Sequence, residues 1–187
     1  MIFLRELTKE DIPTINNWRQ SRDLQDFFAS PFRYINIETD EEWFNNYMKS
    51  RNTQVRLSIC LKETNEIIGM ASLVDIDRIS RKAVYGGIML GHVNNRMKGI
   101  GKEVTMLLLS HAFLDLNLHR VQGLWLLTNH ASIKMGEACG FRREGVLRNA
   151  AYKNGEYVDL LLMAILRPEF DLIKNRDPQS PQKENNS

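Results

Sequence analysis

The sequence predicts an α/β fold in which helices pack on a mixed sheet, and three observations support this prediction. Strand-like and helix-like segments follow one another in a mixed order along the chain. The stretch RMKGIGK, residues 96 to 102, places two glycines and three cations directly before a long apolar helical run. Asn154 and Gly155 join two apolar segments, which is the strongest short-range signal for a hairpin. With 187 residues and 43% hydrophobic content, the chain is long enough for one well-filled core and is expected to form one domain.

Hydrophobic periodicity predicts six elements in the first half of the chain: a strand (2–7), two helices (8–20 and 39–50) and three strands (55–61, 67–76 and 82–90). Thr39 and Glu42 are spaced as a capping box, so the second helix is expected to begin there. Gly86 and Gly87 interrupt the third of these strands. Glycines in a strand indicate either a bulge or close approach by a ligand or a backbone, and the sequence favours neither interpretation.

The second half predicts a helix (99–117), a strand (120–127), a helix (129–139) and a hairpin of two strands (144–153 and 157–166). Asn129 is expected to cap the shorter helix and Gly140 to end it. From Pro168 the chain becomes polar and holds three of its five prolines. Residues 168 to 187 are therefore expected to form a flexible tail after a domain spanning 1 to 167, and removing the tail should change stability little.

Composition excludes several function classes. The 25 Lys and Arg residues nearly balance 23 Asp and Glu, so no global field favours nucleic acid or an anionic membrane as a partner. The N-terminus lacks a signal sequence, and no apolar stretch approaches membrane-spanning length. Cys60 and Cys139 fit reduced thiols in a cytoplasmic protein, and no residues have the spacing of metal ligands.

The stretch of residues 96 to 102 indicates an anion site. Glycines allow close approach to backbone amides, and a helix that begins there directs unpaired N–H groups at whatever lies in front of it. The stretch is not a P-loop, because Arg96 and Glu103 occupy the places where that pattern needs Gly and Ser or Thr. It is also not a dinucleotide fingerprint, since Val104 stands where a third glycine is required.

The order of elements and two motifs together resemble the GNAT superfamily of acyl-CoA-dependent N-acyltransferases, and within it the RimJ/RimL-like branch. RMKGIG matches the superfamily signature Arg/Gln-x-x-Gly-x-Gly/Ala, between the fourth strand and the long helix. Residues 129 to 166 resemble the Asn-x-x-Ser helix, the Gly-Phe stop and the closing hairpin of that family. The likeness covers residues 2 to 167. It implies a GNAT fold with a mixed, mostly antiparallel sheet of about seven strands flanked by about four helices.

The resemblance also implies acetyl-CoA as co-substrate, with its pyrophosphate held by the glycine-containing loop and its pantetheine arm by splayed strand residues. The residues that this assigns to the cofactor are Met89, Leu90, Gly91, Val93, Arg96, Met97, Lys98, Gly99, Ile100, Gly101, Lys102, Asn129 and Ser132. Asn129 and Ser132 match positions that contact the arm or lie near its thioester. Both can equally cap the helix, and the two roles are compatible.

The catalytic groups are less well defined. Many members of the GNAT superfamily carry, on the fourth strand, a Glu that acts as the general base, but the matching position here is Val84 or Tyr85. The remaining candidates for the base are Glu144, Asp75 and Asp77. Many relatives also protonate the leaving thiolate with a Tyr seven residues after the Asn, where this chain has Gly136. Asn129 and Ser132 are therefore the predicted groups that stabilise the leaving thiolate.

The expected activity is direct acetyl transfer to a primary amine, foremost a protein N-terminal α-amine, whose lower pKa demands less help from a base. A polyamine or an amino sugar is the alternative acceptor. Four acidic residues lie close together in the sequence: Glu38, Asp40, Glu41 and Glu42. They could line a site for a cationic substrate, or they could simply stabilise the start of a helix. The missing Tyr and Glu also fit a non-catalytic acetyl-CoA-binding module. A homo-oligomer is compatible with the sequence.

Overall fold

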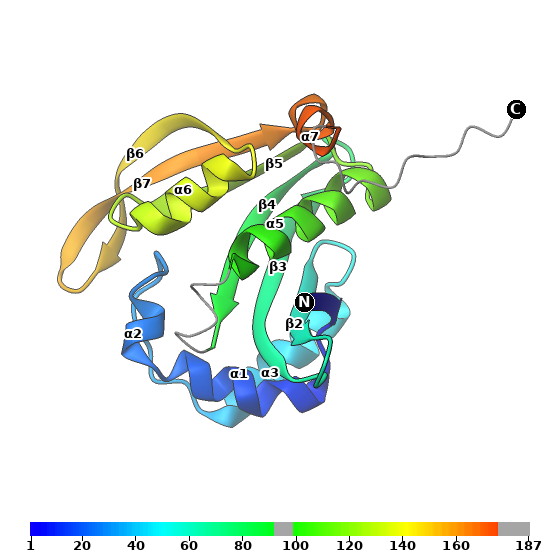
Figure 1. The fold of residues 1–187 in the computed structure, drawn as a ribbon. Helices are drawn as coiled ribbons and strands as arrows, with labels where there is room; N and C mark the ends of the chain where they lie inside the picture. The colour runs from blue at the N-terminus through cyan, green and yellow to red at the C-terminus, as the bar shows by residue number, and fades with distance from the viewer. Residues whose placement is uncertain (92–98, 176–187) are drawn as a thin grey trace, which may run out of the picture.

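The computed structural model describes residues 1–91 and 99–175, which form one seven-stranded sheet in the order β1-β2-β3-β4-β5-β7-β6 (Figure 1). The strands are β1 (Ile2–Glu6), β2 (Val55–Leu61), β3 (Ile67–Asp77), β4 (Lys82–Leu90), β5 (Arg120–Leu126), β6 (Arg142–Lys153) and β7 (Glu156–Leu166). Neighbouring strands are antiparallel, with the exception of β4 and β5, which run parallel. The predicted fold class, a mixed and mostly antiparallel sheet of about seven strands, is confirmed.

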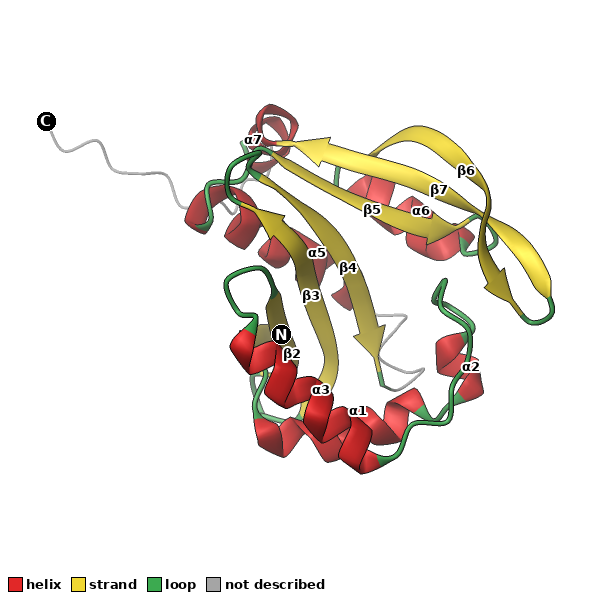
Figure 2. Ribbon diagram, turned by 180° about the vertical axis from the view of Figure 1, so that it is seen from behind, coloured by secondary structure: helices red, strands yellow, loops and turns green. Residues whose placement is uncertain are grey.

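Helices cover both faces of this sheet (Figures 1 and 2). The α-helices of the described residues are α1 (Ile12–Arg19), α2 (Arg22–Gln25), α3 (Ile37–Lys49), α5 (Ile100–Ser110), α6 (His130–Ala138) and α7 (Arg167–Lys174). A 3₁₀ turn, η1 (Lys9–Asp11), precedes α1, and a wider π-helical turn, η2 (His111–Asp115), continues α5. Helices α1 and α3 pack on one face, whereas α5 packs on the other.

Two hydrophobic cores follow from this layering. The apolar stripe predicted for α5 is buried on the sheet, with Val104 and Leu108 fully inaccessible to solvent. On the opposite face, Ile15 of α1 and Phe44 of α3 lie in a second core that also includes Met89 of β4. Strand β4 therefore has a packed helix layer on each side, which fixes the position of the residues that line the pockets described below.

The C-terminal prediction is wrong for residues 168 to 174. Helix α7 covers them, and Phe170 is fully buried with its ring centroid 5.1 Å from that of Phe113. Pro168 does not prevent the helix, because it occupies its first turn, where proline removes no helical hydrogen bond. The rest of the predicted tail, residues 176 to 187, lies outside the described residues.

The helices before β2 differ from the prediction in two ways. Helix α3 begins at Ile37 rather than at Thr39, because Asn36 is its N-cap and accepts a hydrogen bond from the Thr39 N–H over 3.1 Å. The short helix α2 was not expected, since four residues are too few to show a helical period.

The predicted hairpin is confirmed: Asn154 and Gly155 both have positive φ, as the tight turn between β6 and β7 requires.

No helix in residues 1–91 and 99–175 is long and apolar enough to cross a membrane. Over the same ranges, no group of three or more His, Cys, Asp or Glu residues is arranged to hold a metal ion.

Candidate active site

The two parallel strands at the centre of the sheet separate after a short paired section. β4 pairs with β5 only from Lys82 to Val84, opposite Arg120 to Gln122. Beyond these residues both strands continue without pairing to each other, and the views from both sides show them diverging (Figures 1 and 2). The predicted splaying of the fourth strand is thus present, and it begins at Tyr85 rather than at Met89.

A pocket of about 410 Å³ opens where these strands part, and we call it the interstrand pocket. It is lined from four sides: by β4, by the end of β5, by the start of α6 and by the segment that follows α2. Its lining residues are Leu24, Phe27, Phe28, Ala29, Ser30, Tyr85, Gly86, Gly87, Ile88, Met89, Leu90, Gly101, Leu124, Trp125, Leu126, Asn129, Ala131, Ser132 and Met135.

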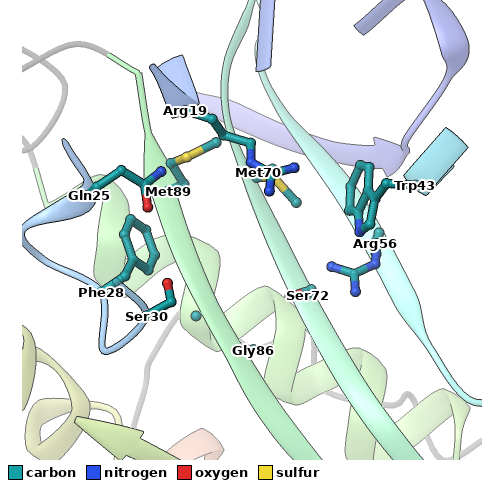
Figure 3. A pocket seen from close by; sticks show the side chains of 11 residues that line it. Arg19, Gln25, Phe28, Ser30, Trp43, Arg56, Met70, Ser72, Gly86 and Met89 are labelled. Atoms are coloured by element: carbon teal, nitrogen blue, oxygen red, sulfur yellow. The ribbon is translucent and has the colours of Figure 1, made fainter. Parts of the chain in front are cut away.

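A second pocket, of about 200 Å³, lies on the face of the sheet covered by α1 and α3, and we call it the helix-side pocket (Figure 3). Its lining residues are Arg19, Gln25, Phe28, Ser30, Trp43, Arg56, Met70, Ser72, Gly86, Gly87 and Met89. Five of these residues also line the interstrand pocket: Phe28, Ser30, Gly86, Gly87 and Met89. The two pockets therefore meet at the middle of β4.

Gly86 and Gly87 form this meeting point for a steric reason. A Cβ on Gly86 would lie 2.2 Å from the Ser72 Oγ of the neighbouring strand, and Gly87 has a φ of +90°, which side chains rarely tolerate. The register between β3 and β4 shifts at the same place, between Ser72 and Leu73. The strand is thus bulged, as one interpretation of the glycine pair predicted, and the same glycines border both pockets.

Asn129 and Ser132 border the interstrand pocket at the start of α6, as predicted. The Asn129 Oδ1 accepts a hydrogen bond from the Ser132 N–H over 3.1 Å, which confirms the helix cap. The Asn129 Nδ2 donates to the Phe27 carbonyl oxygen over 3.3 Å and so ties α6 to the segment after α2. The Asn129 side chain thus has structural partners on both sides.

The Ser132 hydroxyl is held in a defined orientation. Its Oγ accepts a hydrogen bond from the Trp125 indole Nε1 over 3.1 Å. Because the indole can only donate, the hydroxyl hydrogen of Ser132 remains available to a group in the interstrand pocket. The Trp125 ring is itself fixed by stacking on Tyr85, with centroids 5.7 Å apart and an interplanar angle of 11°.

The position of Gly136 lies beside the Trp125 ring. A Cβ at Gly136 would lie 3.4 Å from that ring and 3.8 Å from Met163, which is ordinary van der Waals contact. Tyr85 does not replace the absent tyrosine as an acid. Its hydroxyl is within 3.0 Å of the Thr105 hydroxyl, and burial raises the pKa of Tyr85 far above its usual value.

The predicted cofactor residues divide into three groups. Met89, Leu90, Gly101, Asn129 and Ser132 line the interstrand pocket. Gly91, Gly99, Ile100 and Lys102 flank it without lining it: the Gly91 N–H bonds to the Ile68 carbonyl, while Gly99, with a φ of +73°, caps the start of α5. Val93, Arg96, Met97 and Lys98 lie outside the described residues.

None of the predicted bases lines either pocket. Glu144 forms an ion pair with Arg120, with the Arg120 Nη1 2.7 Å from its Oε1, and this guanidinium lowers the pKa of Glu144. Hydrogen bonds from Ser80 lower the pKa of Asp77, the last residue of β3, and Asp75 is exposed near the same end of the strand. A lowered pKa makes Glu144 and Asp77 poor bases.

The acidic group at the start of α3 also lies outside both pockets. Its buried member, Asp40, accepts a hydrogen bond from the Asn16 Nδ2 over 2.7 Å and is paired with Arg19. The hypothesis that these residues line a site for a cationic substrate therefore has no support in the described structure.

Sequence reasoning missed the three large polar and aromatic residues of the helix-side pocket. Arg19, Trp43 and Arg56 come from α1, α3 and β2, and only the packing of these elements brings them together (Figure 3). The sequence held no specific signal for them. A Trp in a helical segment and an Arg in a strand-like segment do not by themselves show which residues they will meet.

Comparison with known families decides the class of the protein. The family model described as an acetyltransferase (GNAT) domain matches residues 2–142. The chain belongs to the GNAT acetyltransferase family. It is an acyl-CoA-dependent N-acetyltransferase, so the predicted enzyme class is confirmed.

Several relatives match nearly the whole chain. Spermidine N(1)-acetyltransferase of Vibrio cholerae is 28% identical over 170 residues, covering 90% of this chain and 95% of that protein. The uncharacterized N-acetyltransferase p20 of Bacillus licheniformis is 27% identical over 170 residues, covering 90% of this chain and 94% of that protein. A shorter match, 32% identical over 105 residues and 56% of each chain, is to the putative ribosomal N-acetyltransferase YdaF of Bacillus subtilis.

Among solved structures, the crystal structure of spermidine N-acetyltransferase from Vibrio cholerae in complex with CoA and spermine superimposes with a TM-score of 0.84. The two chains are 26% identical, and the match covers 90% of this chain and 97% of that one. The use of acetyl-CoA by this GNAT protein is thereby supported.

Gly101 offers a test of the cofactor site. A Cβ there would meet only Met135, at 3.9 Å, so Gly101→Val should fit the fold but project into the interstrand pocket. We expect the Kd for acetyl-CoA, measured by calorimetry, to rise about tenfold or more, a loss of ~1.4 kcal/mol. Gly145→Val is the matched control, because a Cβ at Gly145 meets nothing within 4 Å and Gly145 lines neither pocket. Equal affinities in the two variants would show that the cofactor does not pass Gly101.

Proposed function

We propose that this GNAT protein transfers the acetyl group of acetyl-CoA directly to the primary amine of a small molecule. One observation carries the proposal: the interstrand and helix-side pockets share five lining residues around Gly86 and Gly87. The thioester of acetyl-CoA would lie in the interstrand pocket, and the amine would reach it from the helix-side pocket. The two glycines add no side chain of their own at the place where the two pockets meet.

In the proposed reaction the neutral amine nitrogen attacks the thioester carbonyl carbon, a C–N bond forms, and the C–S bond breaks. The thiolate leaves near Ser132, whose free hydroxyl hydrogen would stabilise the negative charge on sulfur. The amine proton passes to solvent. Ser132 is thus assigned to the leaving group and Asn129 to the orientation of Ser132.

Direct transfer is favoured over an acetylated cysteine. Cys60 and Cys139 are fully buried and line neither pocket. Burial raises the pKa of both thiols, that of Cys139 to about 11, so both are protonated and weakly nucleophilic at neutral pH. The kinetics should therefore show a ternary complex of protein, acetyl-CoA and amine.

Among the residues that the structure describes, those lining the two pockets offer no base to take the proton of the amine. Among the described residues, no carboxylate and no histidine lines either pocket. Arg19 and Arg56 do line the helix-side pocket, and a nearby cation lowers the pKa of an amine by disfavouring its charged form. The rate should accordingly rise with pH as the bound amine deprotonates.

The names of the relatives support the alternative acceptor, a polyamine, better than the protein N-terminal α-amine that the sequence favoured first. Two curated relatives from Vibrio cholerae and Escherichia coli are spermidine N(1)-acetyltransferases. The protein acceptor and the RimJ/RimL-like branch rest on the shorter match to a putative ribosomal N-acetyltransferase. A helix-side pocket of about 200 Å³ also suits a small amine better than a folded protein chain.

A panel of amines tests the proposal. Release of CoA thiol from acetyl-CoA is measured with polyamines, amino sugars, amino acids and short peptides, and mass spectrometry identifies the acetylated product. We expect turnover with at least one small amine, with initial-rate patterns of a ternary complex. Acetylation of peptides alone would contradict the small-molecule acceptor, and binding of acetyl-CoA without turnover on any amine would contradict the transferase proposal.

A further inference from the structure

Arg56 brings a charge into the helix-side pocket that no carboxylate neutralises. Its Nε and Nη2 donate to the Gln54 Oε1 over 3.0 and 2.7 Å, and its Cζ lies 4.8 Å from the centroid of the Trp43 ring. Its other aromatic neighbour is Tyr47, at 5.9 Å. Within residues 1–91 and 99–175, all of its recorded partners are thus neutral groups.

Arg19, the other guanidinium of this pocket, is neutralised. Its Nη1 pairs with the Oδ1 of Asp40, whose side chain is only 1% exposed. The Arg19 Cζ lies 5.7 Å from the centroid of the same Trp43 ring that Arg56 contacts. Two guanidinium groups therefore flank one indole, and the described lining of the pocket carries one uncompensated positive charge (Figure 3).

The surroundings of Arg56 make this charge costly. Burial lowers the pKa of Arg56, and the charge of Arg19 lowers it further. A partly buried cation that has no counter-ion is unfavourable, and an anion placed beside it removes that cost. Within residues 1–91 and 99–175, the Arg56 Nη1 makes no hydrogen bond, and the planar guanidinium fork matches the oxygens of a carboxylate or a phosphate.

We propose that the acceptor amine of this protein carries an oxyanion, foremost a carboxylate, which Arg56 binds while the amine lies at Gly86 and Gly87. This inference rests on the proposed function and names the substrate class for it. One net positive charge fits a single carboxylate. A polyamine, by contrast, brings additional protonated amines into a cationic pocket, so this chain differs in its acceptor from the spermidine acetyltransferases that it resembles.

Matched pairs of amines that differ only by a carboxylate test the inference. Suitable pairs place the carboxylate at increasing separation from the amine: glycine with methylamine, 4-aminobutyrate with propylamine, and lysine with cadaverine. With saturating acetyl-CoA, we expect kcat/KM to be at least about tenfold higher for the carboxylate member of one pair or more. This is the effect on kcat/KM that one additional charge-assisted hydrogen bond produces. Glucosamine 6-phosphate against glucosamine tests the phosphate source, and a preference in that pair alone assigns the oxyanion to a phosphoryl group.

Variants assign the preference to Arg56. In Arg56→Gln the preference should fall about tenfold, and Arg56→Lys should keep part of it. Arg78→Gln is the matched control, because Arg78 is exposed in the turn after β3 and lines neither pocket; it should leave the preference unchanged. Propionate should inhibit the wild-type protein competitively against the amine, and propionamide should not. This inhibition test needs no variant, so it remains available if Arg56→Gln fails to fold.

Three results would overturn the inference: no preference for the anionic member of any carboxylate or phosphate pair, an unchanged preference in a folded Arg56→Gln protein, or, where a carboxylate pair shows the preference, no inhibition by propionate. Efficient turnover of polyamines alone would leave the proposed function intact and reject only the oxyanion. If no amine is acetylated, the proposed function fails. Calorimetric titration of lysine and cadaverine into the CoA complex then decides the inference on its own, since tighter binding of lysine supports it and equal binding rejects it.

Discussion

Shortening the chain to end at Arg167 is expected to lower the melting temperature by roughly 10 °C, because the deletion removes Phe170 from the core. Phe170 is fully buried against Phe113, and Ile173 from the same helix packs against the core as well. Replacing a buried phenylalanine by alanine typically costs about 3–5 kcal/mol. Phe170→Ala should therefore account for most of the loss that the truncation produces, measured by thermal or denaturant unfolding.

Leu172→Ala is the control within the same helix. The Leu172 side chain is 59% exposed, so its loss should change stability by less than about 0.5 kcal/mol. A chain that ends at Asn175 separates the contribution of α7 from that of the residues after it. If the chain that ends at Arg167 melts within a degree or two of the full-length protein, α7 does not stabilise the core.

Replacing Ser132 by alanine is expected to lower kcat by about 10²-fold or more while leaving the Kd for acetyl-CoA nearly unchanged. The hydroxyl accepts the Trp125 N–H and keeps its own hydrogen for the pocket, so alanine removes a donor that matters most when charge develops on sulfur. Steady-state kinetics give kcat, and calorimetry gives the affinity. Ser132→Thr retains a hydroxyl and should retain a substantial part of the rate.

The pH profile distinguishes this assignment from an unidentified acid. The rate should rise as the amine deprotonates and should not fall again near ~10, where a tyrosine acid of ordinary pKa would ionise. Tyr85 cannot supply such a falling limb, because its pKa is raised and its hydroxyl is bonded to Thr105. A falling limb in that range, or a Ser132→Ala protein with full activity, would mean that another residue protonates the leaving group.

Features that depend on neighbours in sequence could be predicted. The cap at Asn129, the turn at Asn154 and the glycine at the start of α5 each reflect the backbone conformation of one short segment. The position of Ser132 followed from the same segment, three residues after its cap. Local patterns of this kind hold before any tertiary contact is known.

Features that depend on distant partners could not be predicted. Glu144 is an attractive base in sequence, but its pairing with Arg120, 24 residues earlier, becomes visible only when β5 and β6 align on either side of β7. The same holds for Arg19 and Arg56, which meet at Trp43. Pro168 was misleading for another reason. A proline often marks the end of regular structure, but it is equally common in the first turn of a helix, where it lies here.

The short pairing between β4 and β5 places an unpaired strand edge inside the molecule. From Tyr85 to Leu90, β4 has no strand partner on its β5 side. An exposed edge of this kind normally recruits other chains and leads to aggregation. Here Phe27 and Phe28 on one side and the start of α6 on the other flank the opening. The backbone groups of this edge border the interstrand pocket, where the amide groups of a bound ligand can hydrogen-bond to them as a neighbouring strand would.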